Sequence, residues 1–91
     1  MLDKVKMALR ISTDAFDDEL NGLIEAAKLD LGIAGVVLPP QLDDICRIAI
    51  ITYCKMMFGL PEDADRLKRS YDEQKAQLST NSGYTIFGGG R

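Results

Sequence analysis

Three groups of residues in this chain could in principle do chemistry. They are the pair Cys46 and Cys54, the acidic segment DAFDDE over residues 14–19, and the closing residues GGGR. The sequence contains no histidine, so the commonest general base and the commonest neutral metal ligand are both missing. No serine lies in a nucleophile-elbow pattern either.

None of the three groups has the pattern that such chemistry requires. The cysteines lie eight positions apart on an expected helix, roughly 12 Å by helical rise, which is too far for a disulfide. They also lack zinc-ligand partners, so we expect reduced, buried thiols. The acidic segment lacks the glycine and distal glutamate of a calcium loop, and GGGR lacks the strand and helix that flank a phosphate loop. We predict no catalytic residue, no metal and no cofactor, and hence no enzyme.

Length and charge narrow the class of protein further. A chain of 91 residues forms one domain, and its 14 acidic against 11 basic residues give a net charge of −3. This balance disfavours a duplex-DNA-binding surface, which normally carries a basic excess. No apolar run is long enough to span a membrane, and the opening MLDKVKMALR does not have the pattern of a secretory signal. We therefore expect a cytosolic protein without a membrane partner.

The apolar spacing predicts an all-α fold, a small bundle of about four helices. We expect helices over residues 2–10, from the STD start signal at 12–14 to Gly32 or Gly35, over 41–58, and over 62–78. The second helix has an inward face at spacings of three and four, formed by Phe16, Leu20, Leu23, Ile24, Ala27 and Leu31. VVLPPQ is a rigid connector. The last helix carries a thin apolar stripe of Ala64, Leu67, Tyr71 and Leu78, with an expected ion pair between Glu62 and Arg66.

The third helix is apolar around nearly its whole circumference. Such a helix must be buried on most sides, and few other helices exist in this chain to cover it. We therefore predict a buried third helix, part of whose surface is covered by another chain. Met56 and Met57 beside Phe58 could form an adaptable binding surface or belong to the core.

The tail SGYTIFGGGR follows the last helix and has β-strand character. We divide the chain into a helical domain, 1–81, and a flexible or extended C-terminal tail, 82–91. One hypothesis is an extended arm that docks on another chain, with Tyr84, Ile86 and Phe87 as anchors, because unpaired strand groups favour pairing between chains. The alternative is a tail that is disordered or folds on its own domain.

Three segments in this order resemble the head–tail connector family of tailed phages, also described as DNA-packaging proteins. They are VKMALRISTDAFDDELNGLIEAAKLDL, ICRIAIITYCKMMFG and RSYDEQKAQLS, and the resemblance covers residues 2–79. It implies a structural subunit that forms a homo-oligomeric ring below the portal of a phage or prophage capsid. Such a ring extends the DNA channel and joins head to tail after packaging.

The resemblance also implies partners and a location. The partners would be further copies of the chain, the portal protein, and the next connector, stopper or tail protein, while DNA passes through without sequence-specific binding. The protein would lie at the head–tail junction of the virion, and in the host bacterial cytoplasm before assembly. For the protein interface we predict Tyr84, Ile86 and Phe87 together with Met56, Met57 and Tyr71.

Two other classes of function remain open at this point. A small helix-turn-helix regulator of DNA is one, since residues 10–14 link two helices, although the acidic second helix suits phosphate poorly. A helical adaptor or antitoxin-like protein that binds another protein is the other.

Overall fold

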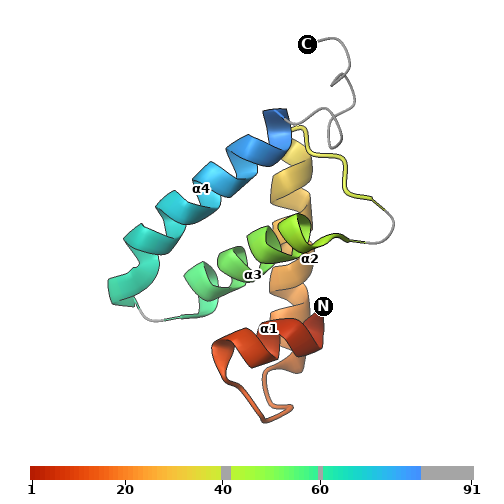
Figure 1. Ribbon diagram of the computed structural model, residues 1–91. Helices are drawn as coiled ribbons and strands as arrows, with labels where there is room; N and C mark the ends of the chain where they lie inside the picture. Colours follow the sequence, from red (N-terminus) through yellow and green to blue (C-terminus); the bar gives the residue numbers. More distant parts are fainter. Residues whose placement is uncertain (40–41, 60, 81–91) are drawn as a thin grey trace.

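The computed structural model describes residues 1–39, 42–59 and 61–80. Within these ranges the chain forms four α-helices and one short 3-10 turn (Figure 1). The helices are α1 (Leu2–Leu9), α2 (Asp17–Ile33), α3 (Asp44–Phe58) and α4 (Ala64–Thr80), and the 3-10 turn η1 (Pro61–Asp63) precedes α4. The predicted all-α bundle of four helices is confirmed.

Helix α3 is the central element, because it packs against each of the other three helices. In Figure 1, α1 crosses the lower end of α2, while α4 lies along α3. The core takes apolar side chains from all four helices: Val5, Leu20, Ile24, Ala27, Leu31, Cys46, Ala49, Ile50, Cys54, Tyr71 and Leu78. The inward face predicted for α2 and the stripe predicted for α4 both contribute to this core, as expected for amphipathic helices. Phe16, predicted on the inward face, is an exception, because it precedes α2 and is 40% exposed.

A polar contact joins α2 to α4 beside the core. The hydroxyl of Tyr71 donates a hydrogen bond to Asp30 Oδ2 at 2.6 Å, and Lys75 Nζ lies 3.1 Å from the same oxygen. The Tyr71 ring packs edge-on against the Tyr53 ring of α3, with 5.3 Å between the ring centroids, and Lys75 Nζ lies over the Tyr71 ring at 5.1 Å from its centroid. Three helices therefore meet at one tyrosine.

This contact also shifts the pKa values of Asp30 and Tyr71. The hydrogen bond from Tyr71 is the main cause that lowers the pKa of Asp30 below its ordinary value of 3.8, with Lys75 helping. Burial, followed by the bond to Asp30, raises the pKa of Tyr71, so the phenol stays protonated and remains a donor.

Helix α1 ends on a strained residue. Arg10 adopts the left-handed conformation with φ 59°, and the backbone N–H groups of Arg10 and Ile11 bond to the carbonyls of Met7 and Lys6. Glycine usually takes this position, since a side chain there costs roughly 1–2 kcal/mol. The arginine is thus retained against a local conformational preference.

The predicted cap of α2 at residues 12–14 is wrong. Helix α2 begins at Asp17, after Phe16, because the polar side chains upstream make other contacts. Thr13 accepts a hydrogen bond from Ala15 N–H, and Asp14 pairs with Lys6 of α1 at 3.1 Å. Lys6 also contacts Asp17 at 2.8 Å, and these bonds, the one to Asp17 first, raise the pKa of Lys6. The acidic first turn itself suits the helix dipole.

The other helix ends follow recognisable local chemistry. Gly35, with φ +93°, ends α2 through bonds from Gly35 N–H to Gly32 and from Val36 N–H to Leu31. Helix α3 begins three residues later than predicted, because Asp43 caps it by accepting the Cys46 N–H at 3.0 Å. The expected Glu62 pair is also wrong, since Arg66 pairs with Asp63 at 3.6 Å.

We predict that Tyr71→Phe lowers the free energy of unfolding by about 1–2 kcal/mol, because the carboxylate of Asp30 loses its donor while the ring and its packing remain. Urea unfolding followed by circular dichroism measures this change. Asp72→Asn, which breaks an exposed pair with Lys68, serves as the control and should change stability by less than about 0.5 kcal/mol. Equal losses in the two variants would contradict the importance of the Asp30 contact.

The same contact makes the stability of the fold depend on pH in the acid range. Since the folded pKa of Asp30 lies below its unfolded value, its stabilisation is present above about pH 4 and is lost as pH falls through the folded pKa. Asp30→Asn should therefore lose less additional stability than the native chain when unfolding is repeated at successively lower pH.

Candidate protein interface

The structure places three of the six predicted interface residues, and their exposure differs greatly. Met57 is 56% exposed, Met56 is half-buried against the core, and Tyr71 is 2% exposed. Met57 is therefore the one of these three that offers most of its side chain to a partner. An interface role for Tyr71 stays a prediction, and in this chain its side chain packs in the core. Tyr84, Ile86 and Phe87 lie outside the described residues.

Helix α3 keeps large apolar side chains in contact with solvent. Ile45 and Ile48 are each 52% exposed, and Met57 lies on the same helix near its end. We call these three residues the α3 apolar group. The helix buries Cys46, Ala49 and Ile50 against its neighbours and leaves the side that carries Ile45 and Ile48 partly uncovered. Met57 is exposed near the end of the helix, about half a turn around its axis from Ile48. The sequence predicted an apolar surface on this helix that its own chain does not fully cover.

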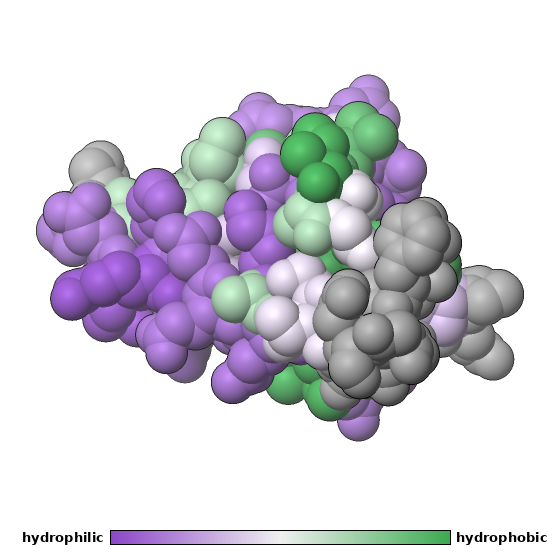
Figure 2. All heavy atoms as spheres, turned by 90° about the horizontal axis from the view of Figure 1, so that it is seen from above, coloured by the Kyte–Doolittle hydropathy of each residue, from purple (hydrophilic) through white to green (hydrophobic). Residues whose placement is uncertain are grey.

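A second uncovered group was missed by the sequence reasoning. Leu29, Ile33 and Val37, which we call the α2 apolar group, lie at the end of α2 and just beyond it, and Ile33 is 85% exposed. The sequence does contain a signal for this group, because Leu29 and Ile33 are four positions apart, on one side of the helix and outside its inward stripe. In Figure 2 green hydrophobic side chains appear as separate groups on one face, and the side where α4 lies is mostly purple.

The described residues contain neither a metal site nor a helix that could span a membrane. Over residues 1–39, 42–59 and 61–80, no group of three or more His, Cys, Asp or Glu side chains could hold a metal ion. Among those same residues, no helix combines the length and apolar character needed to cross a membrane. Charged side chains of α4 form exposed ion pairs, such as Lys68 with Asp72.

Both cysteines are free and buried on α3, as predicted. Burial raises the pKa of the Cys54 thiol to about 11, and burial, followed by the contact with Asp43, raises the pKa of Cys46 to about 11. A thiol with such a pKa holds little thiolate at neutral pH and is a poor nucleophile. The cysteines therefore contribute apolar volume to the core.

Large apolar side chains left uncovered on a helical bundle favour a protein that assembles with others. Comparison with known protein families matches residues 1–85 to the family described as phage connector protein. The chain therefore belongs to the phage connector protein family, a family of structural virion proteins, which favours the connector interpretation over the two regulatory alternatives. A search of curated proteins and a search of solved structures each returned no match.

We predict that neither cysteine reacts readily with a thiol reagent such as DTNB in the native chain at pH 8, because both side chains are buried and protonated. In urea above the unfolding midpoint, both thiols should react with DTNB at the rate of thiols in an unfolded peptide. Fast labelling of the native chain would contradict the burial of α3, and Cys46→Ala and Cys54→Ala would identify the thiol responsible.

Proposed function

We propose that this chain is a subunit of a homo-oligomeric ring that sits below the phage portal, extends the DNA channel and joins head to tail after packaging. Its partners in this proposal are further copies of itself, the portal protein, and the next connector, stopper or tail protein. No catalytic step is part of this role. The protein would be in the host bacterial cytoplasm before assembly and at the head–tail junction of the virion afterwards.

The observation that carries this proposal is the uncovered apolar surface of α3 in a chain of the connector family. Helix α3 packs against three helices and still exposes Ile45, Ile48 and Met57. Single exposed apolar residues are ordinary, but a group on the central helix, with a second group on α2, supports contact with other chains. A ring offers each subunit two neighbours that could cover these groups.

The charge of the chain is compatible with a channel for DNA. Its net charge is −3, so a wall made of such subunits has no overall basic excess to hold the passing phosphates. Helix α4, with its many charged side chains and the exposed pairs Lys68–Asp72 and Arg66–Asp63, is the part least suited to an apolar contact.

The tail supplies a second possible contact. In the proposed division, residues 1–81 form the helical domain and residues 82–91 form an arm that docks on a neighbouring subunit or on the portal through Tyr84, Ile86 and Phe87. A β-prone segment of this kind can pair with a strand edge of another chain.

We predict that Ile48→Asp prevents incorporation of the protein into portal-containing heads while leaving its fold intact. The half-exposed side chain tolerates the change at a cost of about 1 kcal/mol or less, but a charge in a buried interface does not. Ala76→Asp places the same new charge at an exposed position of α4 and is the matched control. Heads purified with each variant are compared by quantitative immunoblotting and electron microscopy.

In that experiment, heads made with the native chain should show added density below the portal and retain DNA, and heads made without the chain should lack the density and leak. The proposed function would be overturned if heads made with and without the protein show the same density below the portal and retain the same amount of DNA. If Ile48→Asp is incorporated as well as Ala76→Asp, the α3 apolar group is not the interface.

Deletion of residues 82–91 tests the arm separately. We expect the shortened chain to keep its helical circular dichroism spectrum, because the described helices end at Thr80, and to lose most of its incorporation into heads. Undiminished incorporation would remove the arm hypothesis and leave the α3 contact standing.

A further inference from the structure

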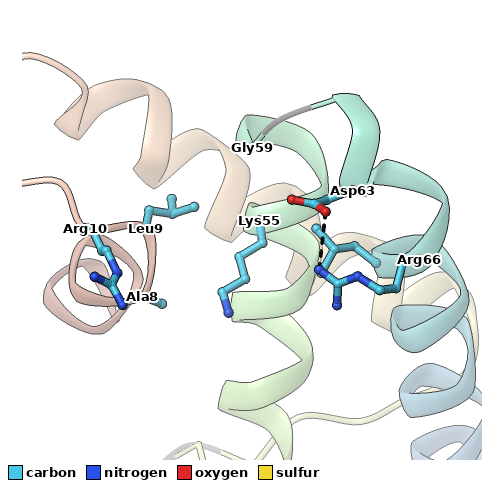
Figure 3. Close-up of a pocket in the computed structure, with 8 residues that line it drawn as sticks. Ala8, Leu9, Arg10, Lys55, Gly59, Asp63 and Arg66 are labelled. Carbon is cyan, nitrogen blue, oxygen red and sulfur yellow. Dashed lines mark ion pairs between the residues drawn. The ribbon is translucent and has the colours of Figure 1, made fainter.

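A basic pocket lies where α1, the end of α3 and the start of α4 come together. It has a volume of about 280 Å³, and its lining comes from residues far apart in the sequence: Ala8, Leu9, Arg10, Lys55, Gly59, Asp63, Arg66 and Leu67. Figure 3 shows Lys55 between Arg10 of α1 and the Arg66–Asp63 pair. Neither the cysteines nor the apolar groups described above belong to this pocket.

The charge of the pocket is opposite to that of the chain. Among its described lining residues three side chains are cationic and Asp63 is anionic, whereas the whole chain carries −3. Asp63 is engaged by Arg66 at 3.6 Å. No ion pair joins Arg10 or Lys55 to any other residue in the described part of the chain. The pocket therefore has positive charge available for an anionic group.

Two backbone features shape this pocket. Arg10 holds its left-handed conformation at the edge, where glycine would fit without strain, so the guanidinium is kept at a conformational cost. At Gly59 a β-carbon would come within 2.5 Å of the Lys55 carbonyl oxygen, so a side chain cannot be placed there without moving the end of α3. Both residues belong to the lining of the pocket.

The size and walls of the pocket favour acidic side chains as the ligand. Its volume of about 280 Å³ is at the lower end of the range for small-molecule pockets and is large enough for one or two carboxylate side chains. Leu9 and Leu67 add apolar wall beside the cations, which suits the methylene carbons of Asp or Glu. The acidic chain as a whole would repel the continuous phosphates of a DNA duplex, while it would not exclude one short acidic segment.

We propose that this pocket binds the carboxylates of Asp18 and Glu19 from a second copy of the chain. The inference rests on the proposed ring, in which each subunit presents one surface to the neighbour on one side and another surface to the neighbour on the other side. The pocket and the acidic first turn of α2 would form the polar half of that contact. Arginine suits such a site because its planar donors match a carboxylate.

Asp18 and Glu19 have the features that this role needs. Both are exposed, adjacent, and held in the first turn of α2. Their neighbours Asp14 and Asp17 are already engaged by Lys6, at 3.1 and 2.8 Å. No ion pair connects Asp18 or Glu19 to another residue over 1–39, 42–59 and 61–80. They are therefore available to a neighbouring copy.

The first test is a titration of the full ¹⁵N-labelled chain with a peptide of its own residues 12–21, STDAFDDELN, followed by NMR. We expect saturable shifts confined to the amides of residues 8–10, 55–59 and 63–67. A peptide with Asp18→Asn and Glu19→Gln should shift nothing. In the chain, Arg66→Gln should weaken the binding roughly tenfold. Arg10→Gly, which accepts the same backbone conformation, should weaken it as well.

Arg69→Gln is the matched control, because Arg69 is an exposed arginine of the same helix outside the pocket, and it should bind the peptide like the native chain. Inorganic phosphate and a short DNA duplex are titrated in parallel. The proposal is overturned if the peptide gives no saturable shift, or if the peptide with Asp18→Asn and Glu19→Gln, which keeps Asp14 and Asp17, binds equally well. It is also overturned if phosphate or the duplex shifts the same amides at lower concentration than the peptide.

The second test exchanges the charges during assembly on portal-containing heads. Arg66→Glu should reduce incorporation, and combining it with Asp18→Arg in the same chain should restore most of it, because each subunit then carries both halves of the reversed contact. If the double variant is incorporated no better than Arg66→Glu alone, the pocket contact is wrong. Native chains would still add density below the portal in that case, so the proposed function would survive.

Discussion

The shared carboxylate of Asp30 fixes how two helices lie on the third. Helices α2 and α4 each pack on α3, and Asp30 of α2 accepts hydrogen bonds from Tyr71 and Lys75 of α4, while the Tyr71 ring rests against Tyr53 of α3. A largely buried phenol and a carboxylate are each costly without a partner, so the two helices are held in one arrangement. That arrangement in turn positions Leu67 and Arg66 on α4 beside α1 and the end of α3.

The sequence predicted the helices and the central place of α3, because apolar spacing is a local signal that survives into the fold. It did not predict the Asp30–Tyr71 contact, whose partners are 41 residues apart and belong to no common motif. It placed the start of α2 too early, since Ser, Thr and Asp side chains can satisfy loop groups as readily as helix ends. It also could not distinguish the covered from the uncovered side of α3, which depends on where α1, α2 and α4 settle.

The uncovered surfaces of the chain are of two chemical kinds. The α2 and α3 apolar groups offer burial of Leu, Ile, Val and Met side chains, which supplies affinity without direction. The pocket offers cations in a defined arrangement, which supplies orientation and discrimination between partners. In the proposed ring the two kinds of contact would act together, since apolar burial favours association and the charged contact would fix the angle between neighbouring subunits. The pocket was not predicted from sequence, since its cations come from three separate helices.

The burial of both cysteines in α3 has a consequence for a particle that leaves its host. Bacterial cytoplasm keeps thiols reduced, whereas the surroundings of a released virion are oxidising. A junction protein with accessible thiols would cross-link or form sulfenic acid after lysis, and its joints would stiffen or distort with age. Here the two thiols stay protonated inside the central helix. In the proposed role, this burial would protect both thiols from disulfide formation and oxidation after the particle leaves the cell.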